Sequence, residues 1–548
     1  MHLRFLALIT AISFAIFGSM PAHAEWHRAE SDRFIIYSDS RADDLEDFAE
    51  TLERFHVALE LETGRTVPIP SPSSRLTIYF VGTRDDLRQL YGARNSSVGG
   101  FYIPRANGSV AFVPNPRFGS AENGRGQLGT RLRRGRGGAR TIDRALRTLL
   151  HEYTHHFLIA SARHAMPRWL SEGAAEYFSS AMFHDNGAVD IGLPNNSRAW
   201  EISQAAEVSL EELLDYDLYR ANRGTRYDAF YGRSWLLFHY LAFEPSRRGQ
   251  LQTYWRAIAG GIDSLTAARQ IFGDLDALSD ELQAYGLRRD MSGIRYAASN
   301  ISIGEVNVAP LSEGHAAMMP VIMQSDRGVD DEKALEVVTE ARRIAERYDN
   351  DAEVFAALAE AEYDAGNDDA AIAAARRAIA LDPTVTNAYV QQGYAMFRKA
   401  GSAEDADAAF AAAMVPFETL NSIEPDHTQP LIYYYRSFSA RGAPPPADAR
   451  VALEYATQLA PFDQGLAIEV AIMKAAEGEH DIARYLLGPV AADPHGGSRA
   501  SAAQSMLDQL STVPEGRRFV FRRVESSDDA PEAGDGDDDS GDGDAADE

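Results

Sequence analysis

A spacing of small and apolar residues recurs along the C-terminal half of this 548-residue chain. Residues 352 to 383 read AEVFAALAEAEYDAGNDDAAIAAARRAIALDP, and the same scheme returns from residue 386 and, more weakly, from residue 462. In the first copy the positions that define the scheme are Phe355, Leu358, Ala359, Gly366, Ala371, Ala375, Ala378 and Pro383. They fall where a 34-residue helix-turn-helix repeat places its small and apolar residues. Small residues let paired helices approach closely, and stacked pairs bury a core that one pair alone cannot bury.

The repeated segment resembles tetratricopeptide repeats (TPRs), and we place it at residues 330 to 515. The resemblance implies an all-α solenoid whose concave surface binds a protein substrate or partner. An ordinary alanine-rich helical domain is the alternative interpretation. Both interpretations predict an α-helical C-terminal domain, but only the repeats imply a concave binding surface.

The segment from residue 25 to 117 has another pattern, typical of a small α/β unit. Strands are expected at residues 32 to 40 and 75 to 82, and a helix at 42 to 64 that ends at Gly64. The stretch GGFYIPRANGSVAFVPNP predicts a hairpin with Asn107-Gly108 at its turn.

Four further segments complete the predicted organisation. Residues 118 to 140 are rich in Gly and Arg and predict a loop, which either is a plain connection or forms a basic lip that attracts acidic ligands. Residues 141 to 300 have a mostly helical pattern, and residues 301 to 329 are expected to be a linker. Residues 516 to 548 form an acidic tail with little to bury, so we expect it to be disordered.

The N-terminus, MHLRFLALITAISFAIFGSMPAHA, has the composition of a secretory signal. Arg4 precedes an apolar run, and Ala22-His23-Ala24 has the form of a cleavage site. We expect cleavage after Ala24 and export to the bacterial periplasm or the medium, with an uncleaved membrane anchor as the alternative. The run is short for a membrane span, and we expect no span after cleavage.

Composition narrows the possible chemistry. The chain has no cysteine, which excludes disulfides, thiolate metal sites and a cysteine nucleophile. Its formal net charge of −28 argues against binding to nucleic acid. Any metal site must therefore use His, Asp or Glu.

Such a site is predicted by the stretch TLLHEYTHHFL, residues 148 to 158. His151 and His155 are four residues apart, so on a helix they point the same way as two nitrogen ligands. Glu152 stands beside the first ligand and can take a proton from a water that the metal activates. This is the HExxH arrangement of zinc hydrolases. The alternative is a helix whose histidines only make local hydrogen bonds.

A zinc site of this kind needs a third protein ligand and one open position. The metzincin pattern requires Gly and His where this chain has Leu158 and Ser161, so it is excluded. The next helical segment, MPRWLSEGAAEYFSS, carries two carboxylates one turn apart. Glu172 is the best candidate for the third ligand. Glu176 either hydrogen-bonds a ligand histidine or is simply solvated.

Together, HEYTH and WLSEGAAEYF resemble the gluzincin metallopeptidases, the clan of thermolysin and the M1 aminopeptidases, and most of all their bacterial relatives of the DUF1570 type. The resemblance covers about residues 26 to 300. It implies that Glu172 is the third zinc ligand and that Glu176 is the partner of a ligand histidine. The predicted fold class is accordingly α+β: a small α/β unit and a helical gluzincin-type domain within residues 25 to 300, then the all-α repeats.

Two more features follow from this resemblance. The segment FYGRSWLLFHYL resembles the helix whose tyrosine stabilises the oxyanion in this clan, which implies Tyr231, with Tyr227 as the substitute. The Gly-x-Met-Glu-Asn strand of the M1 aminopeptidases is absent from the sequence, which favours internal cleavage. We expect residues 109 to 113 to form the edge strand that pairs with the substrate backbone.

The favoured function is thus an exported zinc endopeptidase that hydrolyses peptides or proteins. Its zinc would be held by His151, His155 and Glu172, with Glu152 as general base and Tyr231 at the oxyanion. The alternative is a non-catalytic repeat protein with a structural or vestigial zinc site. An intact Glu152 argues against it, because a structural site needs no base beside its ligand. A cytoplasmic adaptor is excluded if the signal is cleaved.

Overall fold

The computed structural model describes residues 25–93, 98–115, 139–140, 144–162, 164–288, 290–493 and 497–522. The predicted signal peptide, nearly all of the Gly/Arg loop and the acidic tail beyond residue 522 lie outside these residues.

A six-stranded sheet organises the N-terminal part. Its strand order is β10-β1-β2-β3-β5-β4. The strands are β1 (His27–Glu30), β2 (Phe34–Ser38), β3 (Leu76–Val81), β4 (Phe101–Ile103), β5 (Val110–Pro114) and β10 (Asn307–Pro310). β2, β3 and β5 are parallel to one another, whereas β1, β4 and β10 run antiparallel to their neighbours.

The predicted hairpin is present, but its edge strand is not the expected one. β5 lies between β3 and β4, so both of its sides are already paired. β4 is the outer strand instead. The expectation that residues 109 to 113 form a free edge was therefore wrong, because parallel pairing with β3 places the second strand of the hairpin inside the sheet.

Side chains of β3 alternate between the two faces of the sheet, as a period of two requires. Leu76, Ile78 and Phe80 join the core below α1 (Ala42–Thr63) and α3 (Arg144–Ala162). Tyr79 and Val81 face the other side, where α2 (Arg84–Tyr91) and α12 (Glu313–Arg327) cover them. The sheet is thus buried on both faces.

The segment from residue 301 to 329 is not a linker, contrary to the sequence-based expectation. It contains β10, which pairs with β1, and α12, whose Met319 belongs to the core on the second face of the sheet. The strand is only four residues long and its partner lies at the other end of the domain, so local sequence carries little sign of it.

The remaining part of the N-terminal half is mainly helical and includes a second, four-stranded sheet of order β6-β7-β8-β9. These strands are β6 (Ala139–Arg140), β7 (Met182–His184), β8 (Val189–Ile191) and β9 (Ile294–Tyr296). The helices are α4 (Arg168–Ser179), α5 (Asn196–Gln204), α6 (Leu210–Leu214), α7 (Tyr216–Asn222), α8 (Phe230–Phe243), α9 (Gln250–Ala259), α10 (Ser264–Ile271) and α11 (Leu275–Gly286). Three short 3-10 turns are η1 (Pro72–Ser74), η2 (Pro245–Arg247) and η3 (Ala298–Asn300).

The C-terminal half is an array of antiparallel helix pairs, as the repeats predicted. After α12 come α13 (Asp331–Arg347), α14 (Ala352–Asp364), α15 (Asp368–Leu381), α16 (Thr386–Ala400), α17 (Ala406–Ile423), α18 (Thr428–Ser439), α19 (Ala447–Leu459), α20 (Gln464–Glu477), α21 (His480–Ala491) and α22 (Gly497–Ser511). Gly393 shows why the repeat needs small residues: a Cβ there would lie 2.4 Å from the ring of Phe417.

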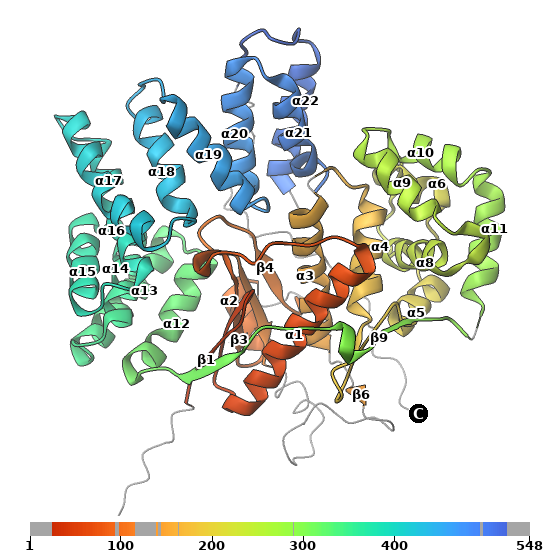
Figure 1. Ribbon diagram of the computed structural model, residues 1–548, viewed down its shortest axis with the longest axis horizontal. Helices are drawn as coiled ribbons and strands as arrows, with labels where there is room; N and C mark the ends of the chain where they lie inside the picture. The colour runs from red at the N-terminus through yellow and green to blue at the C-terminus, as the bar shows by residue number, and fades with distance from the viewer. Residues whose placement is uncertain are drawn as a thin grey trace, which may run out of the picture.

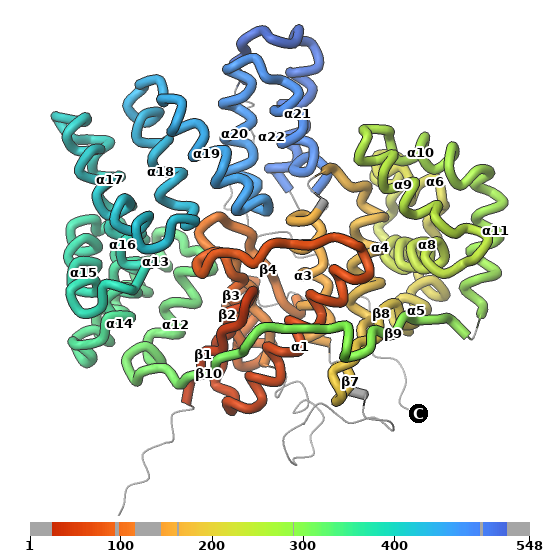
Figure 2. Tube along the Cα trace, viewed as in Figure 1, coloured from red at the N-terminus to blue at the C-terminus, as the bar shows by residue number. Residues whose placement is uncertain are grey.

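The array curves around the end of the main sheet at which the β4–β5 hairpin lies, and the α6–α11 helices stand on the far side of α3 and α4 (Figures 1 and 2). The first part of the predicted disordered tail, residues 516 to 522, is ordered, contrary to expectation. Phe519 and Phe521 pack against the last helices, and the Phe519 amide donates to the carbonyl of Ala475 at 2.9 Å.

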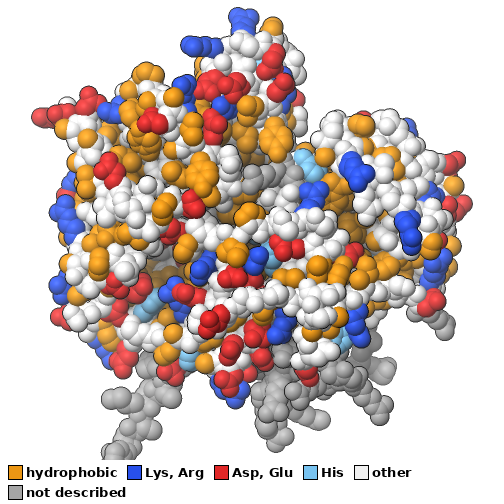
Figure 3. Space-filling model, viewed as in Figure 1, with side chains coloured by type: hydrophobic (Ala, Val, Ile, Leu, Met, Phe, Trp, Pro, Cys, Tyr) orange, Lys and Arg blue, Asp and Glu red, His pale blue; other side chains and the backbone are white. Residues whose placement is uncertain are grey.

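Lys and Arg side chains are scattered over the face shown in Figure 3, and the described residues form no continuous basic surface there. A helix with both the length and the apolar character of a membrane span does not occur in the described part of the chain.

Candidate metal centre

α3 carries the two histidines of the HExxH segment. One side of the helix is buried in the core against the sheet, through Leu149, Leu150, Tyr153, Phe157 and Leu158. His151 and His155 share another side, and their Nε2 atoms are 3.2 Å apart. The apolar residues therefore fix the rotation of the helix that turns both imidazoles toward one point.

α4 brings the third donor to this point. Glu172 is completely buried, and its Oε2 lies 3.4 Å from Nε2 of His151 and 3.5 Å from Nε2 of His155. The glycine that follows lets α4 approach α8, because a Cβ on Gly173 would lie only 2.5 Å from the carbonyl oxygen of Ser234. The WLSEG segment thus supplies both the donor and the close helix contact that places it.

These three residues fit a zinc ion. Their donor atoms all lie within 4.8 Å of one another, and no other group of His, Asp and Glu in the described ranges meets this condition. Tetrahedral zinc with bonds of about 2.0–2.1 Å holds neighbouring donors about 3.3–3.4 Å apart. The observed separations of 3.2, 3.4 and 3.5 Å agree with that spacing.

In both histidines the Nδ1 atom, on the far side of the ring from Nε2, contacts a neighbouring side chain. Nδ1 of His151 lies 3.2 Å from Oε1 of Glu176, one turn after Glu172 on α4. Nδ1 of His155 lies 3.0 Å from Oγ of Ser171. Such contacts turn the opposite nitrogen, Nε2, toward the shared point.

Two residues of α5 and its N-terminal cap fix Glu176 in turn. Arg198 donates to Oε1 of Glu176 at 2.7 Å, and the Asn195 side chain donates to Oε2 at 2.9 Å. Burial raises the pKa of Glu176, but the Arg198 guanidinium and the contact with His151 outweigh it and hold the pKa well below its usual range. Glu176 is therefore a buried carboxylate anion.

The electrostatics of the centre favour a cation. Burial lowers the pKa of His151, but hydrogen bonds to Glu172 and Glu176 outweigh that effect and raise the pKa well above its ordinary value. The two carboxylates thus demand a positive charge between them. A protonated imidazole can supply it, and so can a metal ion bound to neutral histidines.

Tyr231 lies on the first turn of α8 between two arginines. Its hydroxyl accepts a hydrogen bond from Nη2 of Arg168 at 3.2 Å, and the Arg198 guanidinium lies 5.1 Å from the centre of its ring. Arg168 stands one turn before Glu172 on α4, and Arg198 holds Glu176. The tyrosine is therefore linked through Arg198 to Glu176, and through Arg168 to the helix that carries Glu172.

Tyr227, the predicted substitute, is engaged elsewhere. Its hydroxyl donates to Oε2 of Glu201 at 2.8 Å. The same carboxylate receives Arg198 at 2.5 Å and, on its other oxygen, the amide of Gly232 at 2.7 Å. Tyr227 therefore belongs to the contacts that hold α5 against α8, so Tyr231 is the better candidate of the two for the predicted role.

His156 contacts β4 at the edge of the main sheet, and Glu152 lies near enough to affect the electrostatics there. Burial raises the pKa of Tyr102 on β4, and the negative charge of the nearby Glu152 raises it further. The Tyr102 hydroxyl lies 2.6 Å from Nδ1 of His156. The side of α3 beyond the two candidate ligands therefore looks toward β4, the outer strand.

Sequence reasoning missed four residues that support the centre: Ser171, Asn195, Arg198 and Arg168. Ser171 and Arg168 belong to the quoted MPRWLSEG segment, where a donor one residue before Glu172 and a cation one turn before it were available signals. Asn195 and Arg198 had no local signal, because only the fold brings α5 to α4.

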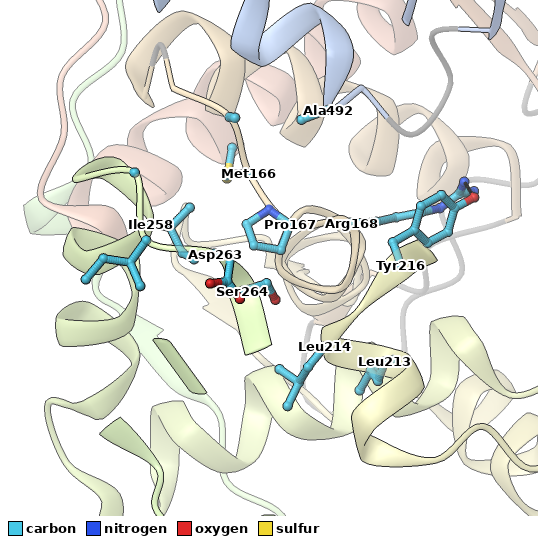
Figure 4. A pocket seen from close by; sticks show the side chains of 13 residues that line it. Met166, Pro167, Arg168, Leu213, Leu214, Tyr216, Ile258, Asp263, Ser264 and Ala492 are labelled. Atoms are coloured by element: carbon cyan, nitrogen blue, oxygen red, sulfur yellow. Dashed lines mark hydrogen bonds between the residues drawn. The ribbon is translucent and has the colours of Figure 1, made fainter. Parts of the chain in front are cut away.

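A cavity of about 280 Å³ opens beside the start of α4 (Figure 4). Its apolar wall includes Met166, Leu213, Leu214 and Ile258. Arg168 and Tyr216 lie together at one side. Ala492, which follows α21, also lines it, so the cavity lies where the helical part meets the end of the repeat array.

Residues 145–259 match a family model described as "Protein of unknown function (DUF1570)". The matched segment contains α3, α4 and α8, with His151, Glu152, His155, Glu172, Glu176 and Tyr231. The DUF1570-type resemblance is confirmed for this segment. The description names no reaction, and no curated protein matches the chain.

Among solved structures, similar chains are TPR proteins and MamA. The thermophilic TPR protein TTC0263 of Thermus thermophilus is 15% identical, covers 35% of this chain and 94% of its own length, and gives a TM-score of 0.29. One structure of MamA is 16% identical, with 34% and 96% covered and a TM-score of 0.24. Another is 15% identical, with 37% and 99% covered and a TM-score of 0.25.

Proposed function

We propose that this chain is an exported zinc-dependent endopeptidase, acting in the periplasm or the medium. One observation carries the proposal: two imidazoles and one carboxylate converge within 4.8 Å at a helix that also bears Glu152. A purely structural zinc site is usually closed by four protein ligands, whereas three leave a position open for substrate chemistry.

His151, His155 and Glu172 would hold the zinc ion. When bound, zinc supplies Lewis acidity toward water and the peptide carbonyl. Glu172 contributes one negative charge, and the charged Glu176 raises the electron density of His151 through its Nδ1 contact.

The chain's own groups would move the protons. Glu152 takes a proton from the attacking water and delivers it to the amide nitrogen as the carbon–nitrogen bond breaks. The hydroxyl of Tyr231 donates to the carbonyl oxygen while that oxygen gains negative charge. Arg168 supports this role, because it donates to the same hydroxyl at 3.2 Å and so places a positive charge beside it.

Two features support a peptide substrate. Among the described residues β4 is paired on one side only, and an extended peptide can add to its other side as a further strand. The cavity beside Arg168 has mostly apolar walls, which supports a preference for an apolar residue near the cleaved bond.

Cleavage of a diverse peptide library by the zinc-loaded chain tests the proposal, with the variant Glu152→Gln beside it. The variant should bind zinc normally and lose at least about 10²-fold in rate, because only the proton acceptor is removed. Glu404→Gln, at an exposed position of the repeats, is the matched control and should cleave like the wild type.

Two results would count against the proposal. Equal cleavage by Glu152→Gln would remove Glu152 from the mechanism. Zinc binding without cleavage by any variant would favour the alternative, a non-catalytic repeat protein. Export is tested separately: sequencing of the mature N-terminus should begin at Glu25.

A further inference from the structure

The outer strand β4 has little support of its own. It is three residues long, and in the part of the chain that the structure describes it pairs only with β5. A strand this short, with a partner on one side only, does not by itself hold a fixed position. Under the proposed function this strand must nevertheless present its free side to a substrate at a defined distance from the metal centre.

The turn that follows β4 is held by the repeat array. The amide of Ala106 donates to Oδ2 of Asp463 at 2.7 Å, and the carbonyl of Ala106 accepts from Oγ1 of Thr428. Ala106 is 5% exposed and Thr428 is fully buried. The backbone N–H and C=O of this buried residue therefore both form hydrogen bonds with the repeats.

A second pair of contacts holds the same hairpin from the other end of the array. Arg105 donates to the carbonyl of Asp326 on α12 at 2.8 Å and forms an ion pair with its carboxylate. Nearby, the amide and the hydroxyl of Ser73 both donate to Oε1 of Glu424, at 3.0 and 2.7 Å. The contacts that hold the hairpin and the neighbouring Ser73 thus come from α12 and from the loops before α18 and α20.

The repeats also reach the helix that carries the metal ligands. The ring of His156, directly after His155, lies 4.7 Å from the ring of Phe462 in the loop before α20. Its Nδ1 lies 2.6 Å from the hydroxyl of Tyr102 in the middle of β4. Ile159 of α3 packs against the same repeat cluster. One loop of the array therefore touches the turn after β4 through Asp463 and α3 through Phe462.

We propose that the repeat array acts as a built-in brace, in which Thr428, Phe462 and Asp463 are positioning residues that set β4 against α3. This inference rests on the proposed function for its catalytic consequence. The side of the array that faces the sheet serves the chain's own hairpin. Since a substrate strand pairs well only with an edge strand of fixed position, contacts this far from the metal affect substrate binding and thereby kcat/KM.

The test removes both hydrogen bonds to Ala106 with little change in shape. Thr428→Val loses the hydroxyl. Asp463→Asn loses the acceptor for the Ala106 amide, yet its remaining oxygen can still cap α20, where Oδ1 accepts from the amide of Leu466. The matched control is Thr419→Val with Asp330→Asn, whose hydrogen bonds stay within the repeats. Thr428→Ser keeps the hydroxyl and should behave as the wild type.

Two measurements on the zinc-loaded full chain test whether the repeats position β4. Amide hydrogen exchange over residues 99–109 should become about tenfold faster in the Thr428→Val/Asp463→Asn double variant and stay unchanged in the control. For a peptide from the library, kcat/KM should fall about tenfold, mostly through KM, because the peptide loses a fixed strand to pair with. Zinc affinity should not change.

Unchanged exchange in residues 99–109 would overturn the brace. Faster exchange with an unchanged kcat/KM would overturn its role in substrate binding, and a parallel loss of zinc would point to general damage instead of a displaced strand. If the wild type cleaved no peptide, the proposed function would fail instead, and exchange alone would decide whether the repeats hold the strand.

Discussion

Oε1 of Glu176 lies 3.2 Å from Nδ1 of His151, and the same oxygen accepts a hydrogen bond from Arg198 at 2.7 Å. The orientation of a candidate metal ligand on α3 therefore depends on a guanidinium from α5. Arg198 also pairs with the buried Glu201 below α8. Arg198 thus contacts both the carboxylate that orients His151 and a carboxylate that lies against the helix bearing Tyr231.

Replacing Arg198 by Met should weaken zinc binding by about 10- to 100-fold, the range typical for partners that orient a metal ligand. Without the guanidinium, burial favours the neutral form of Glu176, which no longer strengthens His151 as a ligand. Competition with a zinc-sensitive dye measures the affinity. Arg220→Met, at an exposed position of α7, is the control, and equal losses in both variants would contradict the argument.

The close contact between α4 and α8 predicts a strong effect at Gly173. A Cβ there would lie 2.5 Å from the backbone oxygen of Ser234, which cannot move without shifting α8. Gly173→Ala should reduce the free energy of unfolding by about 2 to 3 kcal/mol and lower zinc affinity, because Glu172 moves with the helix. Gly224→Ala, where the added Cβ meets nothing within 4 Å, should change neither urea unfolding nor zinc affinity.

The predicted site residues that the structure brings together are those related by one helical period. His151 and His155 are one turn apart, as are Glu172 and Glu176, and burial of the apolar residues beside them fixes the direction of each pair. Such spacing is a local property, so it survives in the sequence without knowledge of the fold.

The features that the sequence did not predict depend on contacts between distant segments. Arg198 reaches Glu176 only because α5 packs near α4, and β10 pairs with β1 across almost the whole domain. The free edge was assigned to the wrong strand of the hairpin for the same reason: which strand lies outside depends on pairing with β3. Strand order depends on tertiary contacts, and the sequence pattern of a hairpin does not show which of its two strands joins the rest of the sheet.

Acidification should weaken the fold through His156. Burial and, to a smaller extent, the nearby His56 together lower the pKa of His156 to about 4. Between this value and the ordinary value of about 6.5, the unfolded chain binds a proton that the folded chain does not, so stability falls as the pH falls through this window. Above pH 7 the effect is absent.

The variant His156→Gln cannot take up this proton. The stability of the wild type relative to this variant should therefore decrease by about 3 kcal/mol between pH 7 and pH 4, because all other groups titrate in both proteins. Urea unfolding at several pH values measures the difference. A difference that stays constant with pH would show that His156 titrates normally in the fold.

The ion pair between Arg105 and Asp326 predicts a coupling between the hairpin and the first helix of the array. Arg105 forms an ion pair with Asp326, and the hydroxyl of Tyr79 donates to the same carboxylate. Burial, and to a smaller extent the negative charge of Asp326, raises the pKa of the neighbouring Glu360. Arg105→Met removes the cation of this pair and should destabilise the chain by about 1 to 3 kcal/mol, since it leaves the partly buried carboxylate of Asp326 without its partner. The double variant Arg105→Met/Asp326→Asn should recover part of this loss, because it also removes the orphaned carboxylate. A double-mutant cycle by urea unfolding measures the coupling, and additive losses would show that the two side chains act independently.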